Sequence, residues 1–311
     1  MTISVCMIVK NEEEVLARCL DSLTGIYDEL IIVDTGSTDS TKSIAKKYGA
    51  KLYDFAWMGD FSDARNFAFN KAGCDYIYSA DADEVIDPEN RLKFMQLKQV
   101  LLPEIEIVEM YYTNQLAFNT TYNFDEELRP KLYKRLRTFT WQDPLHESVR
   151  LDPVIYDSDI RIIHAPTGNH AGRDFSLYKK ALERDGSLSD HLFNMYAREL
   201  YIAGDEKDFA EAVPYFSEQA EKRTTPYDIE TALLVLIRAA RLANDSTRML
   251  KYSSRLFALC EGAQGLPVPA ELCFELGEYF NQNGEKEEGE LWFAQAKGDT
   301  EPVLSKACHD F

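Results

Sequence analysis

The sequence predicts an α/β domain followed by an all-α domain. Strands and amphipathic helices alternate through the first half, polar clusters follow the strands, and helices fill the second half. Alternation of this kind is typical of a parallel sheet with helices on both faces. We therefore expect two domains, over residues 1–172 and 173–311.

Four apolar segments of the first half are predicted to be strands, and the amphipathic segments between them are predicted to be helices. The first helix places Val15, Cys19 and Leu23 on one face, and Gly49 and Gly73 end the second and third helices. The strands are expected at residues 3–9, 28–34, 50–57 and 74–85, and the helices at 11–23, 39–49 and 61–73.

Residues 104–165 lack this regular alternation. Their extended apolar segments predict that a mixed, partly antiparallel portion completes the sheet. From about Asp174 the pattern becomes helical, and Gly204, Asn244 and Gly284 fall in turns 40 residues apart. Such a period is typical of helix–turn–helix repeats in an α-solenoid, and an irregular helical bundle is the alternative.

The chain is acidic, with a formal net charge of −19 over 311 residues. This charge argues against general binding to nucleic acids or anionic membranes, because both require basic surfaces. The apolar run at residues 3–9 is too short for a signal peptide or a membrane span, and no later run is long enough to span. The six cysteines form no CxxC pair, which favours free buried thiols and a cytoplasmic location.

Polar side chains follow three of the predicted strands. Lys10 and Asn11 follow the first, Asp34 ends the second, and Asp81 and Asp83 lie at the end of the fourth. Ligands of open parallel sheets bind outside the carboxyl ends of the strands. We therefore expect these residues to share one edge of the sheet and to form the binding site.

Asp81 and Asp83 form an Asp-x-Asp motif. Such carboxylates can hold Mg²⁺ or Mn²⁺ while diphosphate oxygens complete the coordination shell. The cation then stabilises charge that develops on a phosphate leaving group. A solvated acidic loop is the alternative. Glu84 lies on the other side of the strand period and is expected to cap or to form an ion pair.

Asp34 and Arg65 complete the predicted donor site. A carboxylate at position 34 can accept a hydrogen bond from a base imide or a ribose hydroxyl, whereas the Ser/Thr/Asp cluster after it is expected to form turns and caps. Arg65, near the start of a helix, suits a diphosphate or a base. A salt bridge from Arg65 to Asp60 or Asp63 is an equal alternative.

Four motifs in this order resemble those of the inverting glycosyltransferases of family 2, which have the GT-A fold. The motifs are "CMIVKNEEEVLARCLDSL", "DELIIVDTGSTDST", "DFSDARNFAF" and "YIYSADADEV". The resemblance is strongest to the cytoplasmic branch with a C-terminal tetratricopeptide-like region. That branch includes bacterial enzymes that S-glycosylate bacteriocin peptides and relatives that act on lipopolysaccharide cores. The resemblance covers about the first 165 residues well and the helical half only loosely.

The resemblance implies roles for single residues. The end of the first strand, with Ile8, Val9 and Glu12, would line the nucleotide pocket. Asp34 would bind uracil or ribose, and Arg65 would contact the nucleotide. Asp81 would contact the ribose or the metal, and Asp83 would ligate the metal. The family's usual second acid after Asp34 is Thr35 here, so that base recognition would depend on one carboxylate.

His146 and Glu147 in "PLHESVR" are the predicted catalytic pair. Inverting transfer needs one base near the acceptor, opposite the leaving nucleotide. Related enzymes carry a His-Glu or Glu-Asp pair at this point, and the resemblance therefore implies Glu147 as the base and His146 as a residue that orients it or contacts the acceptor. An ion pair between Glu147 and Arg150 is the alternative. His164, at a later strand end, is a candidate metal ligand, and a hydrogen-bonded structural histidine is the alternative.

The resemblance implies a metal-dependent hexosyltransferase. We expect it to move a sugar from a UDP-linked donor, such as a UDP-hexose or UDP-N-acetylhexosamine, held with Mn²⁺ or Mg²⁺. The acceptor would be a peptide, a protein side chain or a glycan, and the helical half would recognise it or mediate a homodimer. Two alternatives remain: a scaffold with a degenerate transferase half, and a sugar-1-phosphate nucleotidyltransferase. The latter expects a Gly-rich, basic loop after the first strand, which "KNEEEV" lacks.

Overall fold

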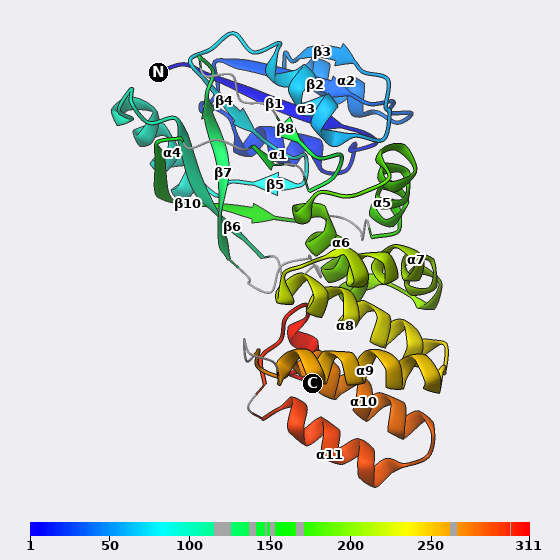
Figure 1. Cartoon of the computed structure of the whole chain (residues 1–311). Helices are drawn as coiled ribbons and strands as arrows, with labels where there is room; N and C mark the ends of the chain where they lie inside the picture. The colour runs from blue at the N-terminus through cyan, green and yellow to red at the C-terminus, as the bar shows by residue number, and fades with distance from the viewer. Residues whose placement is uncertain are drawn as a thin grey trace. The chain divides into compact units, whose positions relative to one another are not determined.

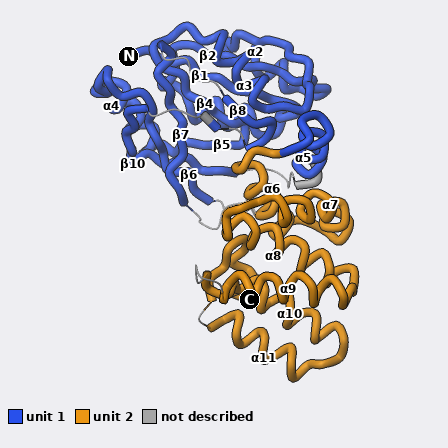
Figure 2. The backbone as a smooth tube through the Cα atoms, in the orientation of Figure 1, with its two compact units in different colours: residues 1–187 blue, residues 188–311 orange. Residues whose placement is uncertain are grey.

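The structure, a computed structural model, describes residues 1–114, 126–136, 141–146, 148–149, 153–165, 171–261, 266–298 and 300–311. The chain forms two compact units, Met1–Ser187 and Leu188–Phe311 (Figure 2). The predicted boundary at residue 172 falls at the start of helix α5 (Ala171–Asp185), and this helix belongs to the first unit. A division into functional domains at residue 172 stays a prediction.

The first unit is built on an eight-stranded mixed sheet (Figure 1). The strand order is β3-β2-β1-β4-β7-β6-β10-β5. Strands β3, β2, β1 and β4 are parallel, while β7 runs antiparallel to both β4 and β6. The predicted α/β fold with a partly antiparallel completion is therefore confirmed. The strands are β1 (Ile3–Val9), β2 (Glu29–Asp34), β3 (Lys51–Asp54), β4 (Tyr76–Ser79), β5 (Glu84–Val85), β6 (Ile107–Thr113), β7 (Glu127–Lys134) and β10 (Ile155–His164).

Helices cover both faces of the sheet, which is why β1 is apolar on both sides. Ile3, Val5 and Met7 join one core with residues of α1, α2 and α4, whereas Cys6 lies in a second core beside Phe69 of α3. Burial on both faces fixes the parallel strands, since each face removes apolar surface from water. The helices are α1 (Leu16–Ser22), α2 (Thr41–Lys47), α3 (Phe61–Phe69) and α4 (Pro88–Val100).

The fourth predicted strand, residues 74–85, is shorter than expected. Strand β4 ends at Ser79, and a turn closed by the Glu84 amide donating to the Asp81 carbonyl (3.2 Å) follows it. The chain then enters β5, which pairs antiparallel with β10. This change of direction buries Glu84, which is 2% exposed. The strand alternation from which its side was predicted therefore does not apply.

The second unit consists of helical hairpins. Each hairpin turns at one of the predicted residues: Gly204 follows α6, Asn244 follows α8 with φ 50°, and Gly284 follows α10 with φ 86°. A side chain at Gly204 would meet the Leu200 carbonyl oxygen at 2.7 Å, so this tight turn requires glycine. The helices are α6 (Asp190–Ala203), α7 (Glu206–Lys222), α8 (Pro226–Leu242), α9 (Ser246–Cys260), α10 (Ala270–Gln282) and α11 (Lys286–Ala296). The predicted all-α half with evenly spaced turns is therefore confirmed.

A buried ionic cluster links α8 to α10 in the second unit. Glu275 is fully buried and forms ion pairs through one oxygen with Arg238 and through the other with Arg241. Arg238 also donates to the Tyr201 carbonyl (3.1 Å). Charges are buried in proteins when they are paired, and here one carboxylate has two guanidinium partners.

Two predictions about the whole chain can be compared with these units. The six cysteines are free, as expected, and five of them are buried. Among the residues that the structure describes, no helix is both long enough and apolar enough to cross a membrane.

Candidate active site

The loops after β1, β2 and β4 meet at the carboxyl edge of the parallel strands, as predicted. Val9 lies beside Asp34 in the sheet register. The amide of Thr35 donates to the Val9 carbonyl (3.0 Å), and the Asn11 amide donates to the Ser37 hydroxyl (2.9 Å). These cross-loop bonds fix the backbone around Asp34, and loops placed by a rigid sheet are where sites commonly form.

Asp34 presents one bonded and one unbonded carboxylate oxygen. Its Oδ1 accepts from the amides of Gly36 (3.0 Å) and Ser37 (2.9 Å), and Lys42 Nζ lies 3.4 Å away. Burial opposes ionisation, but the hydrogen bonds and the Lys42 charge prevail and lower the pKa of Asp34. Its Oδ2 is buried and accepts no hydrogen bond from the described part of the chain. A donor from a ligand, such as a base imide or ribose hydroxyl, would satisfy this atom.

The predicted pocket residues Ile8, Val9 and Glu12 lie at this same edge. Val9 is buried, and its carbonyl accepts from Thr35, whereas Ile8 is half-buried against the second core. The Glu12 carbonyl accepts the Leu16 amide (2.9 Å) and so starts the turn into α1. Their backbone forms one side of the site, and their contact with a nucleotide stays a prediction.

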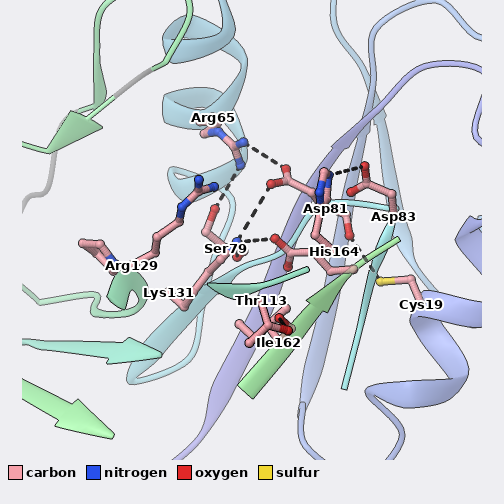
Figure 3. Close-up of polar contacts among 12 residues, drawn as sticks. Cys19, Arg65, Ser79, Asp81, Asp83, Thr113, Arg129, Lys131, Ile162 and His164 are labelled. Atoms are coloured by element: carbon pink, nitrogen blue, oxygen red, sulfur yellow. Dashed lines mark hydrogen bonds and ion pairs between the residues drawn. The ribbon is translucent and has the colours of Figure 1, made fainter. Parts of the chain in front are cut away.

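Arg65 reaches across from α3 to the motif after β4 (Figure 3). Its Nη2 forms an ion pair with Asp81 Oδ1 (2.9 Å), and its Nη1 donates to the Ser79 hydroxyl (3.0 Å). The guanidinium lies 5.1 Å from the ring centre of Trp141. Burial opposes ionisation of Asp81, but the charges of Arg65 and Lys131 prevail and lower its pKa. Asp60, one of the alternative partners of Arg65, instead caps α3 and pairs with Arg184 (3.2 Å).

Asp83 faces His164 from the other side of the motif. The Asp83 Oδ2 atom lies 3.2 Å from His164 Nε2, and β10 carries His164 into register with Glu84. No group of three potential metal ligands occurs among the described residues. Two protein ligands suit a hard cation that draws its remaining oxygens from a diphosphate. The residues present therefore fit Mn²⁺ or Mg²⁺ held together with a nucleotide.

Lys131 of β7 is a site residue that the sequence analysis missed. Its side chain is buried, forms an ion pair with Glu84 Oε1, and lies 3.9 Å from Asp81 Oδ2. The prediction that Glu84 forms an ion pair is therefore confirmed. Burial raises the pKa of Glu84 to about 7, against the lowering effect of Lys131. Lys131 precedes the buried residues Leu132 and Tyr133 inside a strand, and a lysine at such a position is the signal that could have found it.

The predicted catalytic pair lies between β8 (Trp141–Gln142) and β9 (Ser148–Val149). Glu147 and its alternative partner Arg150 lie outside the described residues. His146 has a positive φ of 45°, and its ring lies 6.0 Å from that of Tyr178. The Phe61 amide donates to the Pro144 carbonyl (2.8 Å).

Helix α3 also binds β8 directly. The Asn66 side chain donates to the Trp141 carbonyl (3.0 Å) and accepts from the Trp141 amide (2.8 Å). The helix that carries Arg65 therefore also anchors the segment that leads to His146.

Comparison with known proteins shows what the first unit resembles. Residues 4–150 match the family model "Glycosyl transferase family 2". An uncharacterized glycosyltransferase of Rickettsia typhi is 28% identical over 69% of this chain and 70% of its own length. The SPbeta prophage-derived glycosyltransferase SunS of Bacillus subtilis is 26% identical over 70% of this chain, which spans about half (53%) of that relative.

Two further similarities are more limited. A TPR repeat-containing protein of Synechococcus elongatus is 52% identical over 26% of this chain, and the match spans only 20% of that protein. It agrees with the helical repeats of the second unit. A crystal structure of glucosyl-3-phosphoglycerate synthase from Mycobacterium tuberculosis with Mn²⁺, UDP and glucosyl-3-phosphoglycerate is 17% identical, with a TM-score of 0.43. It covers 61% of this chain and 81% of the synthase, and so low a score carries no functional weight.

The family match and the strand topology confirm the predicted resemblance: residues 4–150 are similar to the glycosyltransferases of family 2, and a Rossmann-like GT-A fold is followed by a helical-repeat unit.

Proposed function

We propose that the protein is a metal-dependent inverting glycosyltransferase that takes a hexose or N-acetylhexosamine from a UDP-linked donor. The family assignment supports the reaction class. The observation that carries the donor site is that Asp34 and the Asp81–Asp83 motif, with Arg65 paired to Asp81, follow parallel strands of one sheet at their carboxyl edge. Such a set combines a buried acceptor for a nucleoside with groups suited to a diphosphate.

The residues of the donor site would divide the nucleotide between them. Asp34 Oδ2 would accept a hydrogen bond from the base or ribose, supported by its lack of a partner among the described residues. Arg65, held by Asp81 and Ser79, would face the diphosphate with a charge that needs no proton transfer. Asp83, with His164 and Asp81, would hold Mn²⁺ or Mg²⁺, which stabilises negative charge on a departing diphosphate when bound.

The acceptor side would be served by the segment after β8. We propose Glu147 as the base that removes the acceptor proton and His146 as a residue that orients the base or contacts the acceptor. The bonds from α3 to Pro144 and Trp141 support this assignment, because they tie the segment to the helix that bears Arg65. Attack from this side, opposite the nucleotide, would invert the anomeric centre.

The predicted division into a transferase domain, residues 1–172, and a helical domain, residues 173–311, is part of the same proposal. The helical domain would recognise a peptide, protein or glycan acceptor or mediate a homodimer, since helical repeats offer extended binding surfaces. A cytoplasmic location is proposed too, and the six free cysteines are consistent with a reducing compartment.

The test is binding and hydrolysis of nucleotide sugars. Thermal unfolding would be followed with UDP, UDP-glucose and UDP-N-acetylglucosamine, each with Mn²⁺, with Mg²⁺ and with EDTA. We expect a stabilising shift that requires both nucleotide and metal, since a ligand that binds the folded state raises its stability. Slow release of free sugar from one donor should accompany it. Absence of any shift would refute the donor site and favour the alternative, a scaffold with a degenerate transferase domain.

A further inference from the structure

Lys131 lies at an irregular point of a central strand. In the pairing of β6 with β7, Val108 lies opposite Leu132, and the next residue, Glu109, lies opposite Pro130. Lys131 is therefore the extra residue of a β-bulge, and proline at position 130 has no amide to lose from the ladder. Bulges redirect a side chain and occur next to active sites.

The redirected ammonium group lies among the acidic residues after β4 (Figure 3). It forms an ion pair with Glu84, donates to the Ser79 carbonyl (3.5 Å), and lies 3.9 Å from Asp81 Oδ2. Its side chain is 8% exposed, and that of Glu84 is 2% exposed. The other oxygen of Glu84, Oε2, is buried and accepts no hydrogen bond from the described residues. Lys131 is thus the cation in contact with the Glu84 charge.

The fixed cations are distributed unevenly over the three acids. Arg65 contacts Asp81 Oδ1, and Lys131 lies near Asp81 Oδ2 and contacts Glu84. Asp83 has the imidazole of His164 as its ion-pair partner. Asp81 and Glu84 therefore have arginine or lysine partners. The partner of Asp83 is the imidazole of His164, a side chain that can also bind a metal ion. The chain itself divides the motif into a balanced and an unbalanced side.

We infer that Lys131 is a positioning residue of the acidic motif, which through its ion pair with Glu84 sets the net charge that the motif offers to the divalent cation. The inference rests on the proposed metal-dependent transferase function and adds a residue to it. Without the ammonium group, the buried Glu84 would have no counter-charge and would be protonated, so that both charges of the pair would be lost together. Without Glu84, Lys131 would keep its charge and face Asp81 alone.

The two halves of the pair therefore have unequal expected effects on metal affinity. In Lys131→Met the lost ammonium group and the protonated Glu84 offset each other, and we expect the Mn²⁺ affinity to stay within about threefold of that of the unaltered protein. In Glu84→Gln the motif gains net positive charge, and we expect binding about tenfold weaker. Lys131→Met/Glu84→Gln restores the balance, and its affinity should return to within about threefold of the unaltered protein. Mn²⁺ binding would be measured by electron paramagnetic resonance of the free ion, with full-length protein and no nucleotide.

A purely structural ion pair gives a different result. Both single variants would then lower the melting temperature while Glu84→Gln kept the Mn²⁺ affinity of the unaltered protein, and this outcome would overturn the inference. If Lys131→Met does not fold, Glu84→Gln and the double variant decide: weakened binding in the first and recovery in the second support the inference, and any other pattern refutes it.

Failure of the proposed function looks different from failure of this inference. If the unaltered protein binds no Mn²⁺ and shows no nucleotide-dependent stabilisation, both fail. If it binds Mn²⁺ and the single variants do not diverge, only the role of Lys131 fails.

Discussion

Each of the two units contains a cluster of charged side chains, and the clusters are balanced in opposite ways. In the helical unit one carboxylate, Glu275, is shared by two arginines, and each of its oxygens has a guanidinium partner. At the sheet edge of the α/β unit three carboxylates share two fixed cations, Arg65 and Lys131. Carboxylates in close proximity repel each other unless a cation lies among them.

The difference separates a structural ion cluster from a functional one. A cluster with no excess of carboxylates is complete within the folded chain, and its loss affects stability. A cluster with an excess of carboxylates at the carboxyl edge of parallel strands has capacity for an external cation. Substitutions in the two clusters should therefore affect different quantities, and the four predictions below use this contrast, from the largest effect to the smallest.

Asp83→Asn tests the unbalanced cluster most directly. Removing this carboxylate should lower metal-dependent hydrolysis of the UDP-sugar donor about a thousandfold, equivalent to about 4 kcal/mol. The melting temperature without metal should stay unchanged, because Asp83 serves the ligand. Asp157→Asn, on the exposed part of β10, is the matched control and should keep full turnover. Undiminished metal-dependent turnover in Asp83→Asn would contradict the assignment.

Glu275→Gln tests the balanced cluster. Two arginines would lose their buried counter-charge, which should lower the free energy of unfolding by about 3 kcal/mol. Urea denaturation followed by circular dichroism measures this quantity, and Glu278→Gln on the same helix is the control. Donor and Mn²⁺ affinities should not change under conditions where the variant is folded. A loss of metal affinity would show that the two clusters are coupled after all.

Glu230 of α8 offers the same substitution, Glu to Gln, with the opposite expected effect on the free energy of unfolding. Burial, together with the charge of Glu271, raises the pKa of Glu230 to about 7. A carboxyl group whose pKa is higher in the folded chain contributes stability below the unfolded value of about 4.3, and this contribution is lost as the pH rises through about 7. Glu230→Gln mimics the protonated acid and keeps this stability at high pH.

The expected measurement is the unfolding free energy at two pH values. Relative to the unaltered protein, Glu230→Gln should gain about 2 kcal/mol in stability between pH 5 and pH 8. Glu278→Gln should show no such pH dependence. An equal effect at both pH values would mean that Glu230 does not titrate in this range.

Asp34→Asn should have the smallest effect. The amide oxygen can still accept from Gly36 and Ser37, so the loop should persist, but the charge offered to the nucleoside is lost. We expect UDP to bind about tenfold more weakly in the presence of Mn²⁺, as measured by calorimetry. Asp54→Asn removes the other carboxylate that pairs with Lys42 and is the matched control. If both variants weaken binding equally, the effect belongs to Lys42.

The places of the proposed donor-site residues in the fold were predictable, because most of them lie directly after strands with clear apolar patterns. Asp34 and Asp83 follow this rule, and Arg65 lies at the start of an amphipathic helix. Lys131 could not be predicted in the same way. Its position depends on the antiparallel pairing of β7 with β4 and β6 and on a bulge, which are properties of distant segments.

Glu84 shows a second limit of sequence patterns. Strand alternation predicted that its side chain lies on the side opposite Asp83. However, the strand ends at Ser79, and the turn that follows places Glu84 differently. Alternation assigns faces only while the strand continues. Helix α4 was also not foreseen, although Asp87 as a cap and Pro88 at the first helical position are ordinary start signals.

The place of Lys131 on a late strand has a consequence for folding during synthesis, because the chain is made from its N-terminus. When β1 to β5 have been synthesised, Asp81, Asp83 and Glu84 are already present, but the lysine that pairs with Glu84 lies on β7 and the histidine beside Asp83 lies on β10. Like charges in the emerging loop repel each other until these strands arrive. The strands that complete the sheet, β7 and β10, therefore also supply the partners of these carboxylates. Pairing of these strands and ordering of the proposed donor site would occur together.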